Sequence, residues 1–130
     1  MDFDGKILGY MKCRRFQDAE KLILDQINTL EKNGSGSRKD LASAYNWLGL
    51  CRYRAVEFDE AQQHFNTAIQ HDSACAQAYY NRGTVCYRMG KSDKAVADME
   101  MAVHLEPHNE EFLLGLTSAK KLQKLSKNNQ

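Results

Sequence analysis

The sequence predicts an all-α fold built from repeated helical hairpins, and three observations support this. The stretch YYNRGTVCYRMG at 79–90 is a second copy of YNWLGLCRYRAV at 45–56, with glycine, tyrosine and arginine recurring 34 residues apart. An interval of this length is typical of stacked pairs of antiparallel helices. Apolar residues near the N-terminus, from Phe3 to Met11, fall on one face of a helix. With 42% apolar residues and a single proline, the chain of 130 residues is expected to form a folded core.

The repeat interval predicts a single domain, 1–126, that contains three helical hairpins. The opening unit fits the pattern least well, since Ile7 stands where a glycine is expected and Gln26 where an alanine is expected. Ala19 and Ala61 are 42 residues apart, eight more than the interval, and the surplus falls in the Gly- and Ser-containing stretch EKNGSGSRKD. We therefore expect repeats at 3–30, 41–74 and 75–108, a flexible surface loop at 31–40, a capping helix at 109–125 and a flexible tail at 127–130.

The recurring residues resemble the tetratricopeptide repeat family, whose first helix carries an aromatic, Leu-Gly and an aromatic, and whose second carries Ala, an aromatic and Ala. Arg82 replaces the leucine and Met99 the second-helix aromatic. The small residues, such as Gly49 and Gly83, are expected where two helix backbones approach closely. The matching positions are Tyr45, Leu48, Gly49, Tyr53, Ala61, Phe65 and Ala68 in one unit, and Tyr79, Gly83, Tyr87, Ala95, Met99, Ala102 and Pro107 in the next. The resemblance implies a right-handed solenoid whose first helices line a concave groove.

Charge and composition exclude several classes of function. A formal net charge of +1 gives no overall field to gather nucleic acid, and no apolar run is long enough to span a membrane. The start of the chain lacks the layout of a signal peptide, which predicts an intracellular, cytoplasmic protein with reduced cysteines. His104 and His108 form the closest histidine pair but straddle Pro107, so no metal site is predicted. We expect no cofactor, no catalytic residues and no enzymatic activity.

The predicted function is protein binding in the concave groove. By the family's pattern, the groove is aromatic with a basic edge, which suits a peptide or helix with apolar anchors and an acidic or C-terminal carboxylate group. The alternative for Tyr53 and Tyr87 is that they pack between helices. The candidate groove residues are Lys12, Asn46, Trp47, Leu50, Tyr53, Arg54, Tyr80, Asn81, Thr84, Tyr87 and Arg88.

Two further expectations concern the partner. The resemblance locates the five positions that clamp chaperone C-terminal tails in this family, and none carries the clamp residue. We therefore expect that the chain does not bind a chaperone tail of the usual kind. A self-associating element, whose groove takes up the terminal helix of another copy, is the competing interpretation. The positions compared are Asp4, Leu8, Trp47, Gln77 and Asn81.

Overall fold

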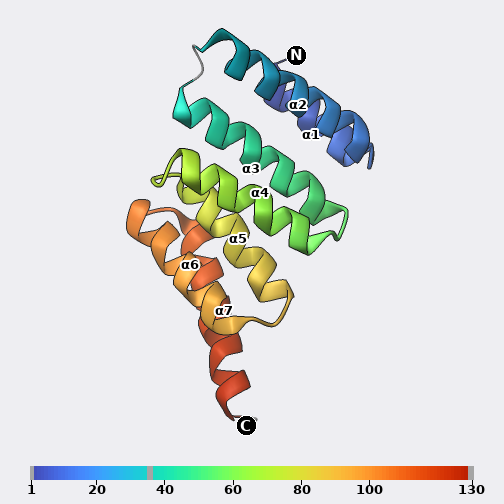
Figure 1. The fold of residues 1–130 in the computed structure, drawn as a ribbon. Helices are drawn as coiled ribbons and strands as arrows, with labels where there is room; N and C mark the ends of the chain where they lie inside the picture. Colours follow the sequence, from blue (N-terminus) through green and yellow to red (C-terminus); the bar gives the residue numbers. More distant parts are fainter. Residues whose placement is uncertain (1, 35–36, 129–130) are drawn as a thin grey trace. The chain divides into compact units, whose positions relative to one another are not determined.

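The structure is a computed structural model that describes residues 2–34 and 37–128. Within these residues the chain forms seven α-helices and no β-strand, which confirms the all-α fold class. Successive helices pair as hairpins (Figure 1). The helices are α1 (Phe3–Lys12), α2 (Phe16–Asn33), α3 (Arg38–Arg54), α4 (Phe58–His71), α5 (Ala76–Arg88), α6 (Ser92–Leu105) and α7 (Glu110–Asn128).

Several helix ends are fixed by side-chain caps. Asp2 Oδ1 accepts a hydrogen bond from the Gly5 amide at 2.7 Å, and Ser37 Oγ accepts one from the Asp40 amide at 3.1 Å. Before α7, Asn109 Oδ1 accepts the Phe112 amide at 3.2 Å. Each bond satisfies one of the amides that a helix start leaves without an intrahelical partner. Gly34 ends α2 in the left-handed conformation, with φ of 59°.

The eight surplus residues extend two helices rather than forming a long loop. α2 has 18 residues against 14 in α4, and α3 has 17 against 13 in α5, so each is four residues longer than its counterpart. α2 therefore runs beyond 30 and α3 begins before 41. Residues 35 and 36 of the expected loop, and residues 129–130 of the expected tail, lie outside the described residues.

The chain forms two compact units, one ending at Ser73 and one beginning at Ala74. In the first unit, α1, α2 and α3 enclose a cluster of buried aliphatic residues around Ile7, Ile23 and Leu48. In the second, α7 packs against α5 and α6, with Phe112 and Ala119 buried. Burial of these apolar side chains is the main favourable contribution to folding. None of the described helices has the length and apolar composition required to cross a bilayer.

The small repeat residues lie at close helix contacts, as predicted. A Cβ atom on Gly49 would be 2.3 Å from Cε1 of Phe65, a fully buried side chain. On Gly83 it would be 3.1 Å from Cβ of Asp98. Four alanines at equivalent second-helix positions are completely buried, namely Ala61, Ala68, Ala95 and Ala102.

Candidate functional site

A pocket of about 240 Å³ lies between α5 and α7 in the second unit. We call it the α5–α7 pocket. Four of its lining residues belong to the predicted groove set and lie on α5, and the other three come from α6 and α7. The predicted residues Tyr80, Thr84, Tyr87 and Arg88 are thus brought together, and the full lining is Tyr80, Thr84, Tyr87, Arg88, Met99, Gly115 and Ser118.

Glycine at position 115 allows α7 to approach α5 at the base of the pocket. A Cβ atom there would lie 2.8 Å from Cε2 of Tyr80 and 3.1 Å from the sulfur of Met99. The Tyr80 ring is in turn stacked on Phe112, with the ring centroids 4.9 Å apart and the planes at 27°. Since Phe112 is buried, the aromatic wall of the pocket is fixed from behind by the core of the unit.

The other predicted residues of α5 have different environments. Thr84 donates its hydroxyl hydrogen to the Tyr80 carbonyl at 2.9 Å, whereas Tyr87 is 38% exposed and Arg88 is exposed. The pocket therefore combines an apolar interior with a cation at its rim. Asn81 is buried and accepts a hydrogen bond from Gln77 Nε2 at 3.1 Å, so it presents little surface to a ligand.

In the first unit, two of the predicted aromatic side chains contact neighbouring helices. Trp47 packs against the core cluster of this unit, and its Nε1–H donates to Asp4 Oδ1 at 3.0 Å. The Tyr53 ring stacks on Phe58 at the start of α4, with centroids 5.8 Å apart. Of the remaining predicted residues, Asn46 is buried, Leu50 is half-buried, and Lys12 and Arg54 are exposed.

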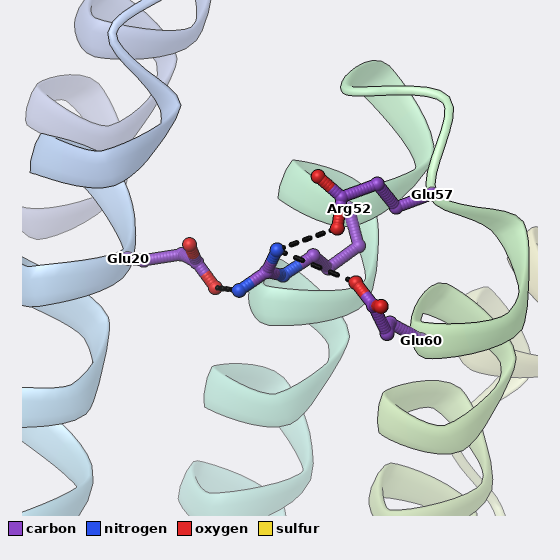
Figure 2. Close-up of polar contacts among 4 residues, drawn as sticks. All are labelled: Glu20, Arg52, Glu57 and Glu60. Atoms are coloured by element: carbon purple, nitrogen blue, oxygen red, sulfur yellow. Dashed lines mark hydrogen bonds and ion pairs between the residues drawn. The ribbon is translucent and has the colours of Figure 1, made fainter.

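A second cavity of about 400 Å³ lies in the first unit, next to a cluster of charged side chains. Figure 2 shows three carboxylates, from Glu20, Glu57 and Glu60, converging on the guanidinium of Arg52 at 2.8, 2.7 and 3.3 Å. The hydrogen bond between the two exposed carboxyls lowers the pKa of Glu57 and raises that of Glu60. These interactions connect α2, α3 and α4, so we assign the cluster a structural role.

The described residues offer little for metal binding or nucleophilic catalysis. In the parts of the chain that the structure describes, no three His, Cys, Asp or Glu side chains are grouped closely enough to hold a metal ion. Burial raises the pKa of the Cys51 thiol to about 11, so this thiol is protonated at neutral pH and is a poor nucleophile. The α5–α7 pocket is consequently our candidate functional site.

Sequence reasoning missed the half of the pocket that α6 and α7 contribute. Met99 was interpreted only as a substitute for the second-helix aromatic, and Gly115 and Ser118 were assigned to a cap. The repeat pattern gives no signal for Gly115, because it follows Gly83 by 32 residues, two short of the interval, and two residues turn a helix by about 200°. Gly115 accordingly faces the preceding helices, whereas Gly83 faces the helix that follows it.

Solved structures share this fold at low sequence identity. The first TPR domain of Spaghetti (RPAP3), bound to the HSP90 peptide SRMEEVD, has a TM-score of 0.77 and 20% identity, and the match covers 94% of this chain and 90% of that one. The first TPR domain of human RPAP3 has a TM-score of 0.81 and 19% identity, and the match covers 98% of this chain and 94% of that one. The second TPR domain of human RPAP3, in complex with the HSP70 peptide SGPTIEEVD, has a TM-score of 0.72 and 21% identity. This match covers 91% of this chain and 92% of that one.

These structures correct the exclusion of chaperone tails. Domains that are only about a fifth identical to this chain, yet share its fold, are solved with HSP90 and HSP70 peptides. The exclusion from five clamp positions was therefore wrong, because it required identical residues at fixed sites. Carboxylates are recognised by any cations and N–H donors within reach, so different positions on the same fold can supply them.

A family model supports the same relationship at the level of sequence. Residues 76–109, which include α5 and α6, match the model described as tetratricopeptide repeat. The match covers the repeat that carries most of the candidate pocket. Residues 76–109 are thus similar in sequence to a tetratricopeptide repeat, and the chain shares its fold with solved TPR domains.

Proposed function

We propose that the chain is a non-enzymatic protein-interaction module and that the α5–α7 pocket receives an apolar side chain of a bound peptide or helix. The observation that carries this proposal is the pocket itself, in which Tyr80, Tyr87 and Met99 surround an apolar interior. Aromatic side chains are frequent anchors of protein interfaces, and Arg88 at the rim suits a carboxylate on the partner. The fold agrees with this proposal, since tetratricopeptide repeat domains act as interaction scaffolds.

Chaperone C-terminal peptides are the first candidates to test, because SRMEEVD and SGPTIEEVD combine apolar residues with several carboxylates. A fluorescein-labelled SRMEEVD peptide would be titrated against the protein and followed by fluorescence anisotropy. Binding is expected to weaken in Tyr87→Ala, which removes an aromatic wall, and in Arg88→Glu, which reverses the rim charge. Lys21→Glu, an exposed change on α2, is the matched control.

A broader experiment addresses partners other than chaperones. Immobilised wild-type protein and the Tyr87→Ala/Arg88→Glu variant would be compared for the proteins that each captures from a cell lysate. We expect a set of proteins to be captured by the wild type and lost by the variant. Identical capture by both, together with unchanged peptide titrations, would refute the pocket as the binding site.

A further inference from the structure

A basic surface covers one end of the second unit. Gln123 Nε2 donates a hydrogen bond to Asp93 Oδ1 at 2.9 Å, which places the C-terminal part of α7 beside the start of α6. Both segments are rich in lysine, and their lysine side chains are exposed. We call these side chains the basic end of the unit, and they are Lys91, Lys94, Lys120, Lys121, Lys124 and Lys127.

Few carboxylates oppose this charge. Residues 112–128 contain no acidic residue, and Asp93 is the acidic residue in the first turn of α6. Glu111 lies at the other end of α7, about 13 Å before Lys120 along the helix axis. This separation exceeds the screening length of about 8 Å at physiological salt. The local field at the basic end is therefore positive, although the formal net charge of the whole chain is only +1.

The last residues of α7 extend beyond the helix against which it packs. Asp93 is the second residue of α6, so the residues that follow Gln123 pass the end of α6, and Figure 1 shows the end of α7 projecting from its unit. Leu125 lies in this projecting segment, between Lys124 and Lys127 in the sequence, and is 60% exposed. The segment therefore presents an apolar side chain flanked by ammonium groups.

We infer that the basic end docks on the surface of an anionic lipid bilayer. Long lysine stems let the ammonium groups reach phosphate and carboxylate head groups while Leu125 enters the interface. All six cations are lysines, whose compact charges suit a diffuse negative surface, whereas a defined carboxylate or phosphate is better matched by the fork of an arginine. A nucleic acid fits less well, because its phosphate backbone would leave Leu125 in water. This inference goes beyond the proposed function, since it concerns a different partner and a different surface.

The test is sedimentation of the full-length protein with vesicles at physiological salt. We expect binding to phosphatidylcholine vesicles that contain about a third phosphatidylserine, none to pure phosphatidylcholine, and release at about 1 M salt. Each lysine near an anionic bilayer strengthens binding by about fivefold, so Lys124→Gln/Lys127→Gln should weaken it at least about tenfold. Leu125→Gln should weaken it several-fold. The matched control is Lys21→Gln/Lys32→Gln, which removes the same charge from exposed positions of α2 and should leave binding unchanged.

Several outcomes would overturn the inference. Equal binding to neutral and anionic vesicles, or no binding to either, contradicts an anionic bilayer as the partner. If the α2 variant loses as much binding as the α7 variant, the overall charge attracts the vesicles and the basic end has no special part. Tighter binding of a duplex RNA than of the vesicles would identify the occupant as a nucleic acid. Tyr87→Ala should bind vesicles like the wild type, and a loss there would assign the lipid contact to the pocket instead.

Discussion

The guanidinium of Arg82 donates two hydrogen bonds to the carboxylate of Asp98, from Nη2 to Oδ1 at 2.7 Å and from Nε to Oδ2 at 2.9 Å. Asp98 is only 8% exposed, and its Cβ atom also limits the space beside Gly83. The hydrogen bond to Asp98 is the main reason that the pKa of Arg82 is raised. A partly buried ion pair thus includes Arg82, which stands where the repeat pattern has a leucine.

Breaking this pair from one side is expected to destabilise the second unit. Arg82→Ala leaves the buried Asp98 carboxylate without its cation and should cost about 2 kcal/mol, less than for a completely buried pair because Arg82 is partly exposed. The double variant Arg82→Leu/Asp98→Ala should be close to wild type, since no charge then remains buried. Urea denaturation of the single and double variants measures both values. Equal destabilisation in the single and double variants would show that lost packing, and not an unpaired charge, lowers the free energy of unfolding.

Gly49→Ala should lower the free energy of unfolding by about 1 to 3 kcal/mol. The new methyl group would lie 2.3 Å from the Phe65 ring, and Phe65 is fully buried, so the ring has little space into which to move. Gly9→Ala is the matched control, because nothing lies within 4 Å of its Cβ position. If the midpoint of urea denaturation is the same for both variants, α4 moves to accept the methyl group without a loss of stability.

Val56→Gly is expected to stabilise the protein by about 0.5 to 1 kcal/mol. Val56 has a φ of 63°, a left-handed conformation that is strained for a β-branched residue. The equivalent turn 34 residues later has Gly90, with a φ of 76°. The entropy that glycine adds to the unfolded chain offsets part of the gain. Thermal denaturation of Val56→Gly and of the reverse change, Gly90→Val, should give shifts of opposite sign.

Ionisation of Cys51 should weaken the protein at alkaline pH. Burial raises the pKa of this thiol from 9.0 to about 11, so between these values the folded state keeps a proton that the unfolded state has lost. The contribution to stability is complete below pH 9 and declines as the pH rises toward 11, by about 2 to 3 kcal/mol. Urea denaturation at pH 7, 9 and 10.5 would compare the wild type with Cys51→Ala. Parallel pH profiles for the two proteins would contradict this assignment.

Ser37→Ala should cost about 1 kcal/mol, because the hydroxyl caps the first turn of α3. A residue in a flexible loop would show no such effect. Ser73→Ala is a suitable control, since Ser73 is exposed and lies outside the helices. Far-ultraviolet circular dichroism during thermal unfolding reports both changes, and a midpoint that is equal for the two variants would argue against the cap.

The repeat interval predicted the parts of the fold that depend on residue size. The residues at positions 49 and 83 have to be small because two helices touch there. The structure places Gly49 and Gly83 each against the helix that follows. Size and spacing are visible in a sequence, so the hairpins and their contacts could be inferred from them.

Pairings across the fold could not be inferred in the same way. Arg82 and Asp98 are 16 residues apart on different helices, and the repeat pattern offers no reason for a charge at either position. The contribution of Gly115 and Ser118 to the pocket was equally hidden, because it requires knowing which face of α7 turns toward α5. Gly34 and Ser37 suggested a loop from composition, although they act as helix caps.

The added residues in α2 and α3 show how this architecture tolerates growth. Ala19 and Ala61 are both the fourth residue of their helices, so the extra residues of α2 lie at its C-terminal end. Gly49 is the twelfth residue of α3 and Gly83 the eighth of α5, so those of α3 lie at its N-terminal end. Four residues are about 1.1 helical turns, or about 6 Å, so the buried faces stay nearly in phase. Two joined helices can therefore lengthen together in steps of eight residues, whereas a step of four or six would leave one helix longer or turned away from its neighbour.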